Sequence, residues 1–309
     1  VEGPEALTLI QKVTINDASR LTPGKAQYTA MCYEDGGIVD DLLVYMLDDE
    51  EYMLVVNAAN IEKDWNWISE NNDVGARLSN RSDSMALLAL QGPESHNILN
   101  QLTELDPSDI PFYSFKIGSV AGEEGIIISA TGYTGEKGFE LYIDTEKADA
   151  LNIWDELMRV GEEYELEPAG LGARDTLRLE MGFALYGNDI TADTNPLEAR
   201  MGWLTKLDKG DFIGSEALLK EKETGVTRKL MGLLIDEPRK VPRSGYDICN
   251  AEGEPIGSVT SGSQSITLGK GIALGYVSID HADIGTQVAV KIRKDLVPAT
   301  VVKPPFIKN

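Results

Sequence analysis

The amino-acid sequence predicts an α+β fold that ends in a separate β-rich domain. Strand-like and helix-like segments alternate up to about residue 221, and short β-like runs between Gly, Pro and Asn turns follow. The chain has 309 residues, of which 42% are hydrophobic and 26% charged. It is therefore long enough for two or three lobes and has the apolar content of a folded protein.

The chain opens with the predicted end of a strand that leads into a helix. Pro4 suits a first helical position, and Leu7, Ile10 and Val13 form one apolar stripe. Because Val1 is the first residue, most of that strand is absent, and we expect the chain to begin inside a domain.

A hairpin and an amphipathic helix are predicted next. The two strands of the hairpin are expected at residues 41–47 and 52–56, joined by the acidic turn 48–50. The helix is expected over residues 60–69, because its apolar residues recur at helical spacing.

A strand–turn–helix pattern then recurs. Residues 87–91 predict a buried strand, and a Gly-Pro-Glu triplet at 92–94 repeats the triplet at 3–5 before another helix. We interpret the recurrence as a diverged internal repeat. Chance remains a rival explanation, since Gly-Pro before a helix is common.

A second hairpin and two helices complete the first part. Residues 125–130 and 139–143 predict strands that flank a Gly-rich turn, and Asp144 or Thr145 is expected to cap the next helix. The expected buried stripe of that helix is Leu151, Trp154 and Met158. A further helix is predicted over 174–181.

The charge balance argues against a nucleic-acid partner. The chain has 28 Lys and Arg against 51 Asp and Glu, a net charge of −23 that repels a phosphate backbone. Solubility or a salty cytoplasm would account for the acid excess, and an acidic docking face is the alternative. No apolar run approaches the roughly 18 residues that a membrane span needs, and Glu2 and Glu5 stand where a leader peptide would be basic.

The cysteine and histidine content limits the possible chemistry. Cys32 and Cys249 lie far apart without CxxC spacing, which favours a reducing compartment and no structural zinc. His96 and His281 are the only histidines, too few for a three-His zinc site, and both fit surface positions. We expect no metal, and an enzyme with this sequence would rely on carboxylates, aromatic rings and an arginine.

Two segments present carboxylates in apolar surroundings. Asp40 and Asp41 lie in a strand-like run and face opposite sides of it, so at most one enters a given pocket. In residues 131–140 (TGYTGEKGFE) the glycines permit a tight turn, Tyr133 could stack on a flat ring, and Glu140 could accept paired hydrogen bonds from an amino-heterocycle. The alternative for the two aspartates is an acid that hydrogen-bonds the backbone in a turn at the start of a strand. The alternative for residues 131–140 is an ordinary hairpin turn with polar surface residues.

Arg174 is expected near a helix N-terminus, where the helix dipole disfavours a cation. This position indicates an anionic partner. A ligand and an internal carboxylate, Asp175 or Glu180, are equally good candidates.

Several longer segments resemble one known family along the whole chain. They are residues 36–45 (GGIVDDLLVY), 55–67 (VVNAANIEKDWNW), 89–93 (ALQGP), 131–140, 170–180 (GLGARDTLRLE), 185–189 (LYGND), 209–218 (KGDFIGSEAL) and 260–262 (TSG). Together, and in this order, they resemble aminomethyltransferase, the T-protein of the glycine cleavage system. The family normally has a further N-terminal segment with a Phe-Asp-Val-Ser-His-Met-type motif, which this sequence lacks.

The resemblance implies an α+β cloverleaf of two interleaved ferredoxin-like units plus a C-terminal β-barrel. The folate-binding region would span 1–221, with one unit at about 1–86 plus 172–221 and the other at 87–171; the barrel would span 222–309. The implied reaction takes the aminomethyl group from the lipoyl arm of the H-protein. It releases ammonia and forms 5,10-methylenetetrahydrofolate, with tetrahydrofolate as co-substrate, in the cytoplasm.

The resemblance also implies roles for individual residues. Asp41 would be the catalytic carboxylate that orients the folate and assists attack by N5. Glu140 would grip the pterin edge. The remaining folate-site residues would be Tyr28, Asn57, Tyr113, Tyr133, Arg174 and Trp203.

Three alternatives remain at this stage. A YgfZ-like folate-binding protein without enzyme activity would carry a cysteine where Asp211 stands in Lys209-Gly210-Asp211-Phe212. A tetrahydrofolate-dependent demethylase of the same fold is the second, and the sequence motifs distinguish it less firmly from a T-protein. A carrier-docking subunit without turnover is the third.

Overall fold

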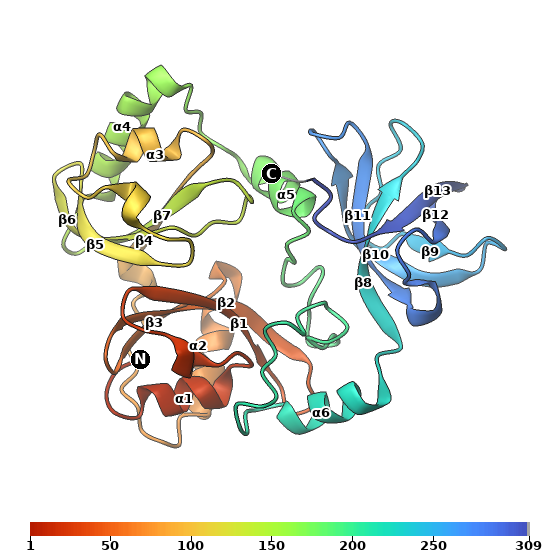
Figure 1. Cartoon of the computed structure of the whole chain (residues 1–309), viewed down its shortest axis with the longest axis horizontal. Helices are drawn as coiled ribbons and strands as arrows, with labels where there is room; N and C mark the ends of the chain where they lie inside the picture. Colours follow the sequence, from red (N-terminus) through yellow and green to blue (C-terminus); the bar gives the residue numbers. More distant parts are fainter. Residues whose placement is uncertain (308–309) are drawn as a thin grey trace. The chain divides into compact units, whose positions relative to one another are not determined.

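The computed structural model describes residues 1–307, and the chain divides into two compact units. The first unit holds Val1–Ile10, Ala18–Tyr28 and Leu43–Gly170; the second holds Gln11–Asp17, Thr29–Leu42 and the chain from Leu171 onward. The chain therefore passes between the units several times, and three elements near its start contribute residues to both (Figure 1).

The first three strands form one sheet in the order β1-β2-β3, in which β2 and β3 are antiparallel. Its elements and the helices beside them in sequence are α1 (Ala6–Val13), β1 (Lys25–Cys32), β2 (Ile38–Asp48), β3 (Glu51–Val55) and α2 (Ile61–Glu70). The predicted hairpin is confirmed: Leu43 pairs with Val55, and the tight turn places Glu50 in the left-handed backbone region. Glu2 forms an isolated β-bridge with Glu51 in place of the predicted strand end, and α1 begins at Ala6 rather than at Pro4.

A four-stranded sheet in the order β4-β7-β6-β5 lies wholly within the first unit. Its elements are β4 (Met85–Gln91), α3 (Ser95–Leu99), β5 (Phe115–Val120), β6 (Glu123–Ser129), β7 (Gly138–Asp144) and α4 (Ala150–Gly161). Helices α3 and α4 pack against one face of this sheet, where Phe139, Leu141 and Ile143 of β7 join their core (Figure 1). Strand alternation sends Glu140 and Tyr142 to the other face.

The second unit ends in a closed six-stranded barrel, which confirms the predicted β-rich domain. The strands follow the order β10-β11-β8-β13-β12-β9, and β10 pairs with β9 to close the ring. Alternate residues of β12, namely Val288, Val290 and Ile292, point into the barrel core, as closure of a sheet requires.

The bounds of the remaining elements in the second unit complete the description. They are α5 (Leu171–Glu180), α6 (Ser215–Thr224), β8 (Arg228–Ile235), β9 (Asp247–Cys249), β10 (Pro255–Gln264), β11 (Gly271–Ser278), β12 (Gln287–Ile292) and β13 (Asp295–Val302).

The predicted cap and apolar stripe of α4 were both wrong. Asp149 is the N-cap, because its carboxylate accepts from the backbone N–H groups of Leu151 and Asn152. The buried face is Ile153, Leu157 and Val160. Leu151 is 75% exposed and Trp154 41% exposed, because Ile153, Leu157 and Val160 form a second apolar stripe at helical spacing, and this stripe is the one that joins the core of the sheet.

The prediction that residues 87–91 form a buried strand was only partly correct. They form most of β4, but β4 is an edge strand of its sheet, and Leu87 is 47% exposed. A run of apolar residues without alternation does not distinguish an edge strand from a central one.

Candidate functional site

Glu140 lies at the centre of a cluster of hydroxyl groups in the first unit. Ser129 stands directly opposite Glu140 in the β6–β7 pair, and Tyr142 follows two residues along β7 on the same face. Thr131 and Tyr142 both donate hydrogen bonds to Glu140 Oε2, the latter over 3.3 Å. One carboxylate oxygen is therefore held from two directions.

Tyr45 of β2 completes the cluster. Its hydroxyl lies 3.1 Å from Ser129 Oγ, 3.1 Å from Thr131 Oγ1 and 3.0 Å from the hydroxyl of Tyr142. The Tyr45 ring packs edge-on against Tyr142, with centroids 5.4 Å apart. The apolar residues around these rings include Phe115, Ile127 and Ala26, so the hydroxyls meet in a largely dry environment.

Burial raises the pKa of each tyrosine in this cluster. For Tyr45 and Tyr142 desolvation is the main cause, and the charge of Glu140 adds to it. For Tyr113 the same effects raise the pKa to about 12. All three phenols therefore stay protonated at neutral pH and act as hydrogen-bond donors rather than as bases.

Tyr113 is the predicted aromatic residue that the structure brings to this cluster. Its ring packs against the apolar core around Tyr45, and it interacts electrostatically with Glu140. Its backbone is left-handed, with φ of 58°, and is held by the hydrogen bond from Tyr113 N to Ala130 O. Tyr28 on β1, Asn57 after β3 and Tyr133 in the β6–β7 turn lie half-buried in the same unit.

Gln91 holds the turn that carries Tyr133. Its Nε2 donates to the carbonyl oxygens of Thr131 and Phe139, at the two ends of the turn, and its Oε1 accepts from Thr134 over 2.8 Å. A Cβ on Gly132 would lie 2.0 Å from Gln91 Oε1, so a larger residue there would displace the Gln91 side chain. The sequence analysis noted Gln91 only as part of a motif and missed this function.

In the second unit, the strand that carries Asp41 is held by the loop after α5. Ile38 N donates to the carbonyl oxygens of Thr191 and Thr194, and the hydroxyl of Tyr186 donates to Ile38 O. A Cβ on Gly37 would lie 2.0 Å from Ala192 O. The glycine before the two acids thus permits this close approach of two backbones.

Asp40 and Asp41 have different environments, as the strand alternation predicted. Asp40 is fully buried, whereas Asp41 is partly exposed. Asp40 Oδ1 accepts a hydrogen bond from Asp41 N over 2.9 Å. Of the two, only Asp41 is accessible to a ligand.

Arg174 is exposed on α5, and Asp175, one of the two carboxylates considered as its partner, pairs with Arg178. Arg178 Nη2 lies 2.6 Å from Asp175 Oδ1, and Nη1 lies 2.7 Å from Asp189 Oδ2. Glu180, the other candidate partner, accepts from Ser265 and Thr267 instead. Trp203 is 67% exposed in the same unit.

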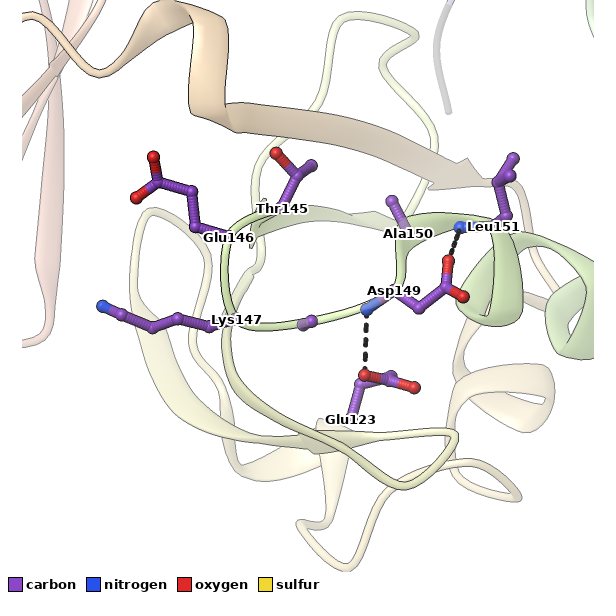
Figure 2. A pocket seen from close by; sticks show the side chains of 8 residues that line it. Glu123, Thr145, Glu146, Lys147, Asp149, Ala150 and Leu151 are labelled. Carbon is purple, nitrogen blue, oxygen red and sulfur yellow. Dashed lines mark hydrogen bonds between the residues drawn. The ribbon is translucent and has the colours of Figure 1, made fainter.

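A surface hollow of about 570 Å³ lies beside the N-terminus of α4, and none of the predicted site residues lines it. Figure 2 shows that its acidic groups serve the local backbone: Glu123 accepts from Asp149 N, and Asp149 caps α4. We assign it no function.

Residues 1–307 contain no group of three or more His, Cys, Asp or Glu side chains placed to hold a metal ion. None of their helices is both long and apolar enough to cross a membrane. Cys32 and Cys249 are both buried free thiols.

Comparison with known families defines the class first. The model of the GCVT N-terminal domain matches residues 1–209, and that of the glycine cleavage T-protein C-terminal barrel domain matches residues 228–308. The chain thus combines an α+β region with the closed barrel described above, the two domains of a glycine cleavage transferase.

Individual relatives agree with this class. The aminomethyltransferase of Bacteroides thetaiotaomicron is 54% identical, and that of Flavobacterium psychrophilum 52%; each alignment covers 100% of this chain and 85% of the relative. The crystal structure of the glycine cleavage system aminomethyltransferase T from Bartonella henselae superposes with a TM-score of 0.89 at 31% identity, covering 99% of this chain and 82% of that one.

The chain belongs to the glycine cleavage T-protein family, and its activity is that of an aminomethyltransferase. The resemblance drawn from the sequence motifs is confirmed. The demethylase, YgfZ-like and carrier-docking alternatives are set aside on the same grounds.

Proposed function

We propose that this aminomethyltransferase uses tetrahydrofolate as co-substrate and the lipoyl-bearing H-protein as donor. The aminomethyl carbon leaves the lipoyl sulfur and its own nitrogen, and forms bonds to N5 and N10 of the folate. The two N–H protons of the folate end on ammonia and on the dihydrolipoyl thiol, so that atoms and electrons balance.

The observation that carries this proposal is the held carboxylate of Glu140 beside an aromatic side chain. A reduced pterin presents N–H donors along one edge and a flat face. A carboxylate accepts paired N–H donors well, and a ring such as that of Tyr113 offers a surface for the face. The carboxylate acceptor of Glu140 and the neighbouring ring therefore suit the head of tetrahydrofolate.

The remaining predicted residues take supporting roles in this proposal. Tyr28, Asn57 and Tyr133 would contact the folate. Arg174 would bind the acidic tail of the folate, and Trp203 is the weaker of the aromatic candidates.

We assign the catalytic role to Asp41. Its carboxylate would orient the folate so that N5 attacks the methylene carbon, and would take up the N10 proton when N10 then bonds to the same carbon and closes the ring. Holding two reactants in one orientation would supply much of the rate. The partial exposure of Asp41, against the complete burial of Asp40, supports this choice between the two acids.

We also propose the finer domain organisation and the cellular location that the family resemblance implies. They are the cloverleaf of two interleaved ferredoxin-like units, the domain limits 1–86 with 172–221, 87–171 and 222–309, and a cytoplasmic location. The closed barrel that begins with β8 supports a boundary between residues 221 and 228.

Calorimetric titration with 5-methyltetrahydrofolate tests the folate site. We expect saturable binding that Glu140→Ala abolishes, because the pterin donors lose their acceptor. Glu136→Ala, which changes an exposed acid in the same turn, is the matched control and should bind like the wild type. Binding of equal strength in Glu140→Ala would remove Glu140 from the site.

A further inference from the structure

The four hydroxyl groups around Glu140 contain too few protons for all the contacts between them. The six close oxygen pairs involve Tyr45, Ser129, Thr131, Tyr142 and Glu140. Each hydroxyl has one proton to donate and two lone pairs. With Glu140 ionised, only four of the six pairs can be hydrogen bonds at once.

This count fixes the direction of the chain of hydrogen bonds. Thr131 and Tyr142 donate to Glu140 Oε2, so neither has a proton left for Tyr45 or Ser129. When the Tyr45 proton goes to Tyr142, the chain runs from Tyr45 through Tyr142 to the carboxylate. Ser129 then donates either to Thr131 over 2.9 Å or to Tyr45.

Every proton in this arrangement points toward Glu140. Hydroxyls that polarise one another in series strengthen the last bond of the chain. The cluster is also buried: Tyr45, Ser129, Thr131 and Tyr142 are each at most 4% exposed. An arrangement of this kind favours a negatively charged carboxylate in one fixed plane.

We propose that Thr131 and Tyr142, backed by Tyr45 and Ser129, are positioning residues that fix the Glu140 carboxylate for the pterin head group. They act through Glu140 and do not touch the reacting atoms. The inference rests on the proposed function, since it takes the folate site at Glu140 as given. It adds that the affinity for the folate head depends on hydroxyl groups behind the carboxylate.

Paired substitutions at Thr131 separate the hydroxyl group from the shape of the side chain. Thr131→Ser retains the hydroxyl, whereas Thr131→Val retains the shape and removes the hydroxyl. Tyr142→Phe removes a single oxygen from the other donor and guards against a folding defect in Thr131→Val. Thermal unfolding of each variant serves as the folding control.

The affinity for 5-methyltetrahydrofolate is the first readout. Loss of a hydrogen bond to a charged group should weaken binding about tenfold in Thr131→Val and in Tyr142→Phe. Thr131→Ser should bind within about twofold of the wild type, because the donor remains. If Thr131→Ser and Thr131→Val lose affinity equally, or if Thr131→Val and Tyr142→Phe bind like the wild type, the inference is overturned.

The kinetics of ammonia release form the second readout, which a purely structural role would not reproduce. Thr131→Val and Tyr142→Phe should raise the KM for tetrahydrofolate and leave kcat and the KM for H-protein nearly unchanged. A fall in kcat without a rise in that KM contradicts the inference. Glu140→Ala separates the proposed function from the present inference. If Glu140→Ala binds folate normally, the proposed folate site is wrong. If Glu140→Ala loses binding but Thr131→Val and Tyr142→Phe do not, only the positioning role of the hydroxyl groups is wrong.

Discussion

Arg178 Nη1 donates a hydrogen bond to Asp189 Oδ2 over 2.7 Å, and both side chains are buried. The same Asp189 carboxylate accepts from the hydroxyls of Thr260 and Ser261 in β10. One buried ion pair thus connects helix α5, the loop after it and the barrel within the second unit. Removing Asp189 is costly, because the buried Arg178 is left with the half-exposed Asp175 as an ion-pair partner and the hydroxyls of Thr260 and Ser261 lose their acceptor.

Asp189→Ala is therefore expected to lower the free energy of unfolding by about 3–5 kcal/mol. Urea unfolding followed by circular dichroism measures the change. Asp175→Ala is the control: its side chain is half-exposed and bonds the same arginine, so it should cost only about 1 kcal/mol or less. Equal losses in the two variants would show that burial does not decide the effect.

Asp41→Asn tests the catalytic assignment. Removing a group that handles a proton in the reaction should lower kcat by about 10²-fold or more, while the affinity for 5-methyltetrahydrofolate changes little. Asp49→Asn, in the exposed turn after the same strand, is the matched control. Unchanged ammonia release in Asp41→Asn would remove Asp41 from the mechanism.

Gly132→Ala would bring a methyl group against the Gln91 side chain, and Gln91→Ala removes that side chain, so the two substitutions test each other. Gly132→Ala should displace the Gln91 side chain from the turn, which destabilises the protein by about 1–3 kcal/mol and weakens folate binding. Gln91→Ala should have similar effects, because the turn loses its hydrogen bonds.

The double variant Gln91→Ala/Gly132→Ala should be no worse than Gln91→Ala alone, since the clashing side chain is gone. Calorimetric titration and thermal unfolding of the three variants provide the comparison. Strictly additive losses would mean that the two residues do not act on each other.

Lys209 gives a pH-dependent prediction. Its Nζ donates to the backbone oxygens of Gln11, Thr14 and Asn16, while burial lowers its pKa to about 7. The unfolded chain keeps the proton up to a pKa of about 10.4. Between these two values the unfolded state binds more protons, so the contribution of Lys209 makes stability rise with pH.

Comparison with Lys209→Met isolates this contribution. Between pH 8 and 9.5 the free energy of unfolding of the wild type should rise relative to that of the variant by about 1 kcal/mol per pH unit. Urea unfolding at several pH values gives both slopes. Parallel slopes would place the folded-state pKa of Lys209 near its ordinary value.

The sequence predicted the elements of this fold better than their faces. The β2–β3 hairpin, the β6–β7 hairpin and the β-rich C-terminal domain all follow from local apolar periodicity and turn residues. The cap and buried face of α4 did not, because Asp149 competed with two earlier acceptable caps. Ile153, Leu157 and Val160 recur at helical spacing just as the predicted stripe does, so periodicity alone did not decide which of the two stripes is buried.

The candidate site was only partly accessible to sequence reasoning. Glu140 stands out as a carboxylate after a Gly-rich turn, and the i, i+2 spacing of Glu140 and Tyr142 could have indicated a shared face. Tyr45 could not be found this way, since it lies 84 positions before Ser129 in the chain and meets it only through tertiary packing. The pairing of Arg178 with Asp189 also depends on the fold rather than on local spacing.

Ammonia release from aminomethyl-loaded H-protein, measured with and without tetrahydrofolate, tests the central claim most directly. We predict rapid release that requires tetrahydrofolate and yields one 5,10-methylenetetrahydrofolate per ammonia. A release rate that does not respond to tetrahydrofolate, or no release from protein that binds 5-methyltetrahydrofolate, would contradict the proposed reaction.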